Sequence, residues 1–84
     1  MNAIEILGYT AGTISTLTFL PQVIKTWRSK SAGDVSLMMF VFATVSVIMW
    51  LVYGILIKNG SIIYTNGTIL ILSLIMLWLK IKYK

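Results

Sequence analysis

Asn66 and Trp50 are the two side chains that most clearly offer binding chemistry within the apolar parts of this sequence. Asn66 lies inside an apolar stretch, where an amide must find partners in protein or in a watery cavity. Trp50 offers a broad ring face and one N–H donor. Together, the ring and the amide could hold a neutral molecule that carries hydroxyl groups. A hydrogen bond between helices is the simpler role for Asn66.

Catalytic chemistry has almost no residues to draw on. The chain of 84 residues has no His and no Cys, and its only carboxylates, Glu5 and Asp34, fall in different segments. General acid–base catalysis or metal binding needs such groups close together. We therefore expect no enzymatic activity, no metal site and no other cofactor.

The composition indicates an integral membrane protein. Hydrophobic residues make up 58% of the chain, charged residues 11%, and the mean hydropathy is +0.94; a soluble domain of this size could not bury that much apolar surface. Residues 6–24, 36–57 and 62–79 carry no charge. As helices they would be roughly 27 to 33 Å long, which is enough to cross a hydrocarbon core of about 30 Å. We predict one all-α domain over 1–84, a bundle of three transmembrane helices at about 4–24, 36–57 and 62–79.

Short polar connections at 25–35 and 58–61 predict that consecutive helices are antiparallel neighbours. Every Lys and Arg except Lys58 falls in the first connection or in the C-terminal tail. Cytoplasmic segments carry an excess of these residues, so we expect the C-terminus in the cytoplasm and the N-terminus outside. The basic residues then mark membrane topology rather than a nucleic-acid partner.

The predicted helices bring Trp50 and Asn66 to a similar depth. Trp50 lies roughly 10 Å, and Asn66 roughly 6 Å, from the outer ends of their spans. This pairing suits a sugar, whose C–H faces stack on an indole and whose hydroxyls bond an amide. No charged side chain lies near the middle of any span, where ion-coupled carriers place such groups. The sequence therefore favours a neutral, uncoupled pathway.

Two backbone features distinguish the first span. Gly8 and Gly12, followed by Ser15 or Thr16, form a stripe of small residues that lets another helix approach closely. Pro21, the only proline, removes one backbone hydrogen bond near the inner end of the span. A flexing point and a static kink are both compatible with it.

Four short motifs in this sequence resemble those of the bacterial SemiSWEET sugar transporters, half-size relatives of SWEETs in the PQ-loop family. They are FLPQVIKT at 19–26, KSAGDVSL at 30–37, WLVYG at 50–54 and YTNG at 64–67. The resemblance, which covers about residues 6–79, implies a parallel homodimer of 3+3 helices that encloses one sugar site. The odd number of spans agrees, because two protomers of the same topology must then pair in parallel.

The resemblance also implies roles for particular residues. Trp50 and Asn66 of both chains would contact the sugar. Pro21 would be the flexing point for alternating access, with Gln22 beside it supporting the motion. The gates would include Tyr53 at the extracellular end, and Phe19 and Met39 at the intracellular end.

The implied function is facilitated, uncoupled (uniport) transport of mono- or disaccharides such as glucose or sucrose across a bacterial inner membrane. Two alternatives stay open. One is a PQ-loop carrier of amino acids or another small metabolite, which would favour a charged group in the pathway. The other is a non-transporting or pore-forming small membrane subunit, which needs no tryptophan and asparagine at matched depth.

Overall fold

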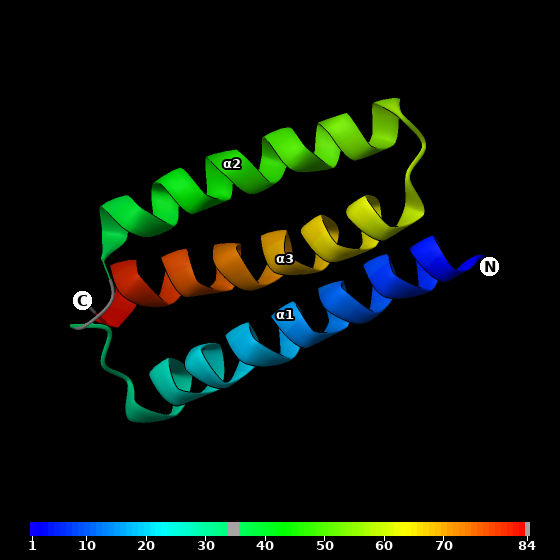
Figure 1. Cartoon of the computed structure of the whole chain (residues 1–84). Coiled ribbons are helices and arrows are strands. Elements are labelled where there is room, and N and C mark those ends of the chain that lie inside the picture. Colours follow the sequence, from blue (N-terminus) through cyan, green and yellow to red (C-terminus); the bar gives the residue numbers. More distant parts are fainter. Residues whose placement is uncertain (34–35, 84) are drawn as a thin grey trace.

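The structure, a computed structural model, describes residues 1–33 and 36–83. It consists of three helices, α1 (Ala3–Ser29), α2 (Leu37–Leu56) and α3 (Gly60–Tyr83) (Figure 1). Each helix is long and apolar enough to cross a membrane, and the described residues form no strand. The predicted all-α bundle of three membrane-spanning helices is confirmed. Outside the described residues lie Asp34, Val35 and Lys84.

Polar side chains determine where the helices begin. The side-chain oxygens of Asn2, Ser36 and Asn59 each accept a backbone N–H bond from the third residue further on, at 2.8, 3.2 and 3.1 Å. They satisfy N–H groups that have no partner within the first turn of a helix. At its other end, α1 continues through residues 25–29, which include Lys25 and Arg28, and stops at Lys30, which has a left-handed φ of 53°. Helices α1 and α3 therefore extend beyond their charge-free stretches at 6–24 and 62–79, whereas α2 lies within the stretch 36–57.

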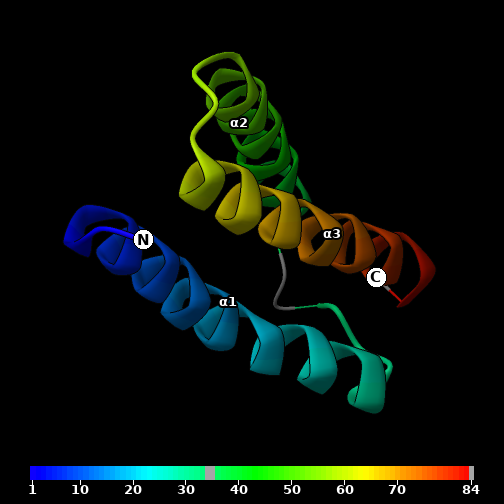
Figure 2. The same ribbon diagram turned by 90° about the vertical axis from the view of Figure 1, so that its right-hand side faces the viewer.

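The order of the helices in space differs from their order in the chain. Helix α3 lies between α1 and α2 and packs against both, while the backbones of α1 and α2 do not approach each other (Figures 1 and 2). The expectation that consecutive helices are neighbours therefore holds for α2 and α3 and is wrong for α1 and α2. The connection after α1 is long enough to pass the end of α3, since seven extended residues span up to about 23 Å and two helix spacings are about 16 to 20 Å.

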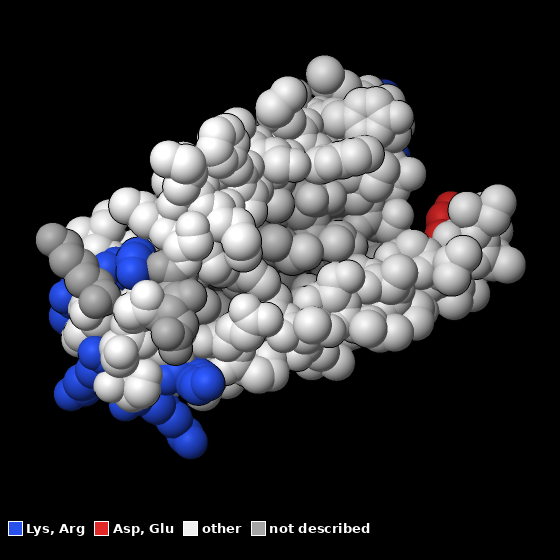
Figure 3. Space-filling model, turned by 60° about the vertical axis from the view of Figure 1, so that its left-hand side comes forward, with Lys and Arg blue, Asp and Glu red and all other residues white. Residues whose placement is uncertain are grey.

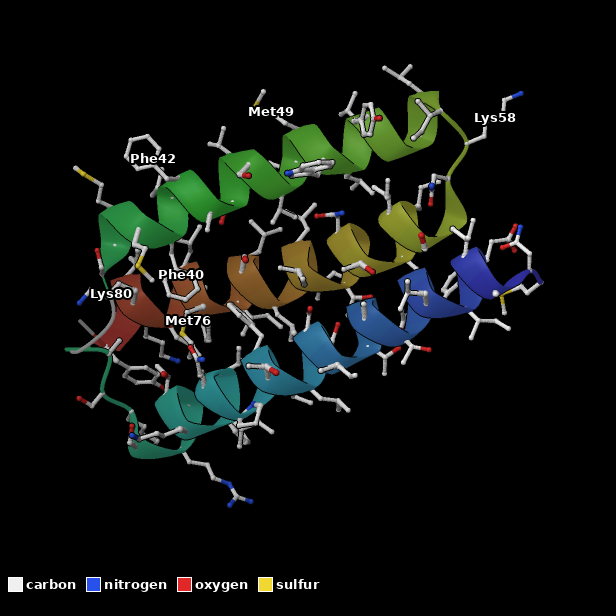
Figure 4. The ribbon with its side chains drawn as sticks, in the orientation of Figure 1. Phe40, Phe42, Met49, Lys58, Met76 and Lys80 are labelled. Atoms are coloured by element: carbon white, nitrogen blue, oxygen red, sulfur yellow. The ribbon has the colours of Figure 1, made fainter. Side chains whose placement is uncertain are left out.

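The buried apolar core lies near the C-terminal end of α3, where all three helices contribute side chains. Phe40 of α2 and Met76 of α3 both belong to this core and lie close together in Figure 4. Phe19 of α1 packs against this core, with its ring edge-to-face on Phe40 and 5.7 Å between the ring centroids. The core consists of Val23, Phe40, Leu72, Met76 and Leu79.

Small residues let α1 and α3 approach closely at their N-terminal ends. A Cβ added to Gly8 would lie 2.6 Å from the Ser61 hydroxyl oxygen, and one added to Gly12 would collide with the Thr65 side chain. The predicted role of this glycine stripe in close helix packing is confirmed. The threonine hydroxyls further along α1 bond carbonyls of their own helix, as membrane helices commonly arrange.

Candidate functional site

Trp50 and Asn66 line one wide-open cavity of about 360 Å³ on the surface of the single chain, near the N-terminal ends of α1 and α3. Helix α2 contributes Trp50 and helix α3 contributes Asn66, while α1 contributes a wall of small residues that includes Ala11 and Ser15. The sequence placed the two side chains at a similar depth, and the fold brings both to the same cavity. The residues that line it are Gly8, Ala11, Gly12, Ser15, Trp50, Ser61, Ile62, Thr65 and Asn66, and none of them is charged.

The amide of Asn66 is only partly engaged. Its Nδ2 donates a hydrogen bond to the Ile62 carbonyl one turn earlier in α3, at 3.0 Å. Within residues 1–33 and 36–83 it bonds no other helix, so the simpler role of an interhelical hydrogen bond is not what the structure shows. The Oδ1 and the second N–H of this half-buried amide have no hydrogen bond among the described residues, so both remain available.

An aromatic pair extends the site along α2. The rings of Trp50 and Tyr53 meet edge-to-face, with 5.7 Å between their centroids and 84° between their planes. They are 52% and 50% exposed in the single chain, and with Ser46 and Met49 they line a shallow hollow of about 300 Å³. A ring held on edge by its neighbour keeps a fixed face available for stacking.

A second cavity, of about 530 Å³, lies at the opposite end of the bundle. Gln22 and Met39, two residues with predicted roles in motion and gating, both line it, together with Lys25 and several hydroxyl side chains. Phe19 lies elsewhere, half-buried against the apolar core. Pro21 is exposed within α1, and the helix continues through it.

Charge is divided between the two ends of the molecule. Most lysine and arginine side chains gather at one end, and Glu5 lies at the other together with Lys58 (Figure 3). We call the first the basic end; its cations are Lys25, Arg28, Lys30, Lys80 and Lys82. Between the two ends, the described spans hold no charged side chain near their middle, and the described residues contain no cluster of His, Cys, Asp or Glu that could hold a metal ion.

The lining residues that the sequence did not predict include Ala11, Ser61 and Thr65. Positions 8, 11, 12 and 15 of α1 are separated by three and four residues, so they share one helix face. That spacing of small residues was a usable signal for Ala11. No sequence signal pointed to Ser61 or Thr65, because they line the cavity only where α3 meets α1.

Three apolar helices of membrane-spanning length, beside an uncharged cavity lined by an indole and an amide, define a small integral membrane protein with one candidate binding site. Comparison with known proteins agrees with that class. The PQ loop repeat family matches residues 3–63. This chain belongs to the PQ-loop family, and within it to the SemiSWEET group.

Two relatives and one solved structure illustrate the membership. A protein of Bradyrhizobium diazoefficiens named sugar transporter SemiSWEET is 34% identical over 80 residues, which cover 95% of this chain and 93% of the relative. A protein of the same name from Leptospira biflexa is 36% identical over 77 residues, covering 92% and 91%. The crystal structure of a bacterial homologue of SWEET transporters superposes with a TM-score of 0.93 at 38% identity, covering 99% of this chain and all of the other.

Proposed function

We propose that this chain moves neutral sugars across the membrane. The observation that carries the proposal is that Trp50 and Asn66, from two helices, line one uncharged cavity. Its volume of about 360 Å³ lies within the range of small-molecule sites, about 300 to 1,000 Å³. A sugar ring would stack its C–H face on the indole and bond its hydroxyls to the amide. The relatives named as sugar transporters support the same substrate class.

The working unit is a parallel homodimer. The cavity is open on one side in the single chain, where Trp50 is half-exposed. A second copy with the same topology would face it with its own Trp50 and Asn66 and close the site from the other side. Two bundles of three helices would thus enclose one sugar, with contacts from both protomers.

Transport proceeds by alternating access around this fixed site. Tyr53, next to Trp50, forms part of the extracellular gate, and Met39, on the second cavity, forms part of the intracellular gate with Phe19. Pro21 leaves the Leu17 carbonyl without its helical partner, so α1 can flex there, and Gln22 supports the motion. No charged group lines the sugar cavity, so the transport is uncoupled uniport of mono- or disaccharides such as glucose or sucrose.

The basic end faces the cytoplasm of a bacterial inner membrane, and the N-terminus lies outside. This orientation follows from the gathering of Lys and Arg at one end of the bundle (Figure 3).

Counterflow of labelled sugar into proteoliposomes, without any ion gradient, tests the function. We expect uptake of glucose or sucrose by the unmodified chain and its loss in Trp50→Ala and Asn66→Ala. Trp78→Ala and Thr68→Val serve as matched controls: Trp78 lies outside the cavity with Lys82 over its ring, 4.6 Å from the ring centroid, and Thr68 bonds the Tyr64 carbonyl of its own helix.

A requirement for a proton or sodium gradient would overturn the uncoupled mechanism. If protein shown to be folded and dimeric takes up neither glucose nor sucrose, the sugar assignment is overturned. The amino-acid carrier and the pore-forming subunit would then be tested next, the latter by its higher oligomers in mild detergent.

A further inference from the structure

Most of the hydroxyl groups along α1 already have hydrogen-bond partners. Thr13, Thr16 and Thr18 each donate to the carbonyl four residues earlier, at 2.9, 3.0 and 2.9 Å, and Thr26 does the same at 2.9 Å. These hydroxyls use their protons within their own helix, and the Thr13 hydroxyl also shares a hydrogen bond with the Tyr64 hydroxyl of α3, with 2.8 Å between the oxygens, so they have little left to offer a solute. The hydroxyls of Thr10 and Ser15 have no partner among residues 1–33 and 36–83, and of these two only Ser15 lines the cavity of Trp50 and Asn66.

The position of Ser15 on α1 explains why its hydroxyl is available. It shares one helix face with Gly8 and Gly12, but those two glycines are covered by Ser61 and Thr65 of α3. Ser15 lies beyond this contact, and its side chain is exposed in the single chain. Seven residues further along the same face, Gln22 lines the second cavity. This face of α1 therefore runs from one cavity to the other, with Ser15 at the sugar end.

The three helices thus contribute three different groups to one cavity. Helix α2 offers the Trp50 ring, α3 offers the Asn66 amide and α1 offers the Ser15 hydroxyl. A sugar presents C–H groups on its ring faces and hydroxyls around its edge, so one stacking contact and two separate hydrogen bonds would fix its orientation. A site that bonds a particular substrate hydroxyl discriminates against analogues that lack it.

We propose that Ser15 is a further sugar-binding residue that determines specificity, its hydroxyl bonding a sugar hydroxyl other than the one bound by Asn66. The inference rests on the proposed function and deepens it, because it adds to the site a contact from α1. Serine can donate and accept at once, so it can join the network of hydroxyls on a sugar edge without a charge.

The test compares glucose with singly deoxygenated glucose analogues, as competitors of labelled glucose counterflow in proteoliposomes. For the unmodified chain, we expect one analogue to compete about three- to tenfold more weakly than glucose because it lacks the Ser15 partner. Ser15→Ala should weaken the competition by glucose by the same factor and leave the competition by that analogue unchanged. This loss of discrimination against one analogue is a coupling that a merely structural change in the helix would not produce.

Thr68→Val provides the matched control, since it removes a hydroxyl that is bonded within α3 and lies two residues, about 200°, around the helix from Asn66. It should leave the whole competition series unchanged. If Ser15→Ala keeps the unmodified pattern while Asn66→Ala loses glucose binding, the Ser15 assignment is wrong and the sugar site stands. If the folded, unmodified dimer binds neither glucose nor sucrose, the proposed function fails and the Ser15 assignment fails with it.

Discussion

The ammonium group of Lys80, near the end of α3, donates a hydrogen bond to the backbone carbonyl of Ala32, with 2.7 Å between Nζ and the oxygen. Ala32 is 1% exposed. It lies in the connection that carries the chain from α1 past α3 to α2, at the end of the bundle where Figure 4 labels Lys80. This one contact fastens the connection to the end of the central helix. It therefore ties the connection between α1 and α2 to the central helix against which both of them pack.

Replacing Lys80 tests that attachment. Lys80→Met keeps most of the side-chain length but leaves a buried carbonyl without its charged donor, which costs about 1.5 to 3 kcal/mol. We expect a clearly lower thermal unfolding temperature in detergent. Lys82→Met is the control, because Lys82 is exposed over the ring of Trp78 and its loss should cost about 0.5 to 1 kcal/mol. If both substitutions lower the unfolding temperature equally, the hydrogen bond from Lys80 to the Ala32 carbonyl contributes no more stability than the contact of Lys82 with Trp78.

The close approach of α1 and α3 predicts a strong difference between two glycines. Gly12→Ala introduces a methyl group against the Thr65 side chain, and such overpacking costs about 1 to 3 kcal/mol. Gly67→Ala meets nothing within 4 Å and should be neutral or stabilising by up to about 1 kcal/mol, because alanine favours helix. Unfolding temperatures of the two variants in the same detergent make the comparison. A tolerated Gly12→Ala would contradict the packing described above.

Phe19 and Met39, both proposed for the intracellular gate, should respond differently to truncation. Phe19 packs on Phe40 in the apolar core, so Phe19→Ala should lower stability by a few kcal/mol, toward the range of about 3 to 5 for buried aromatics. Met39 is 63% exposed and lines the second cavity, so Met39→Ala should stay within about 0.5 kcal/mol and alter transport instead. Stability and counterflow measured on both variants separate the two effects. A destabilising Met39→Ala would place that side chain in the core rather than at a gate.

Substitutions of Pro21 distinguish a flexing point from a static kink. Pro21→Ala restores the backbone N–H toward the Leu17 carbonyl and removes a helix cost of about 3 kcal/mol. If α1 flexes there, the variant should be at least as stable and transport more slowly. Pro21→Gly also restores the N–H but keeps the backbone flexible, so it should retain more transport than Pro21→Ala. Unchanged counterflow in Pro21→Ala would identify the proline as a static feature.

The orientation can be measured directly because the chain contains no cysteine. Single replacements Lys58→Cys and Lys30→Cys place one thiol at each end of the bundle, at the two positions of left-handed backbone outside the helices. In intact cells, a membrane-impermeant maleimide should label the first and not the second. The reverse pattern would invert the proposed topology.

Charge and hydropathy determined much of this protein without any tertiary information. Three uncharged stretches predict three spans, because a lipid environment requires each backbone polar group to be satisfied within a helix. The glycine stripe of α1 was also predictable from the sequence, because small residues at helical spacing have few uses besides close packing. The similar depth of Trp50 and Asn66 was also predictable, because the rise of a helix fixes depth along its axis. In the structure both side chains line the same cavity.

What only the tertiary structure decided is which faces of the helices meet. The placement of α3 between α1 and α2 depends on a connection long enough to allow either order, so the sequence had no means of excluding the other one. That placement puts Phe19 against the core and leaves Ser15 on the cavity. Depth along a helix is a property of one segment, whereas the contacts around its circumference depend on partners that come from elsewhere in the chain.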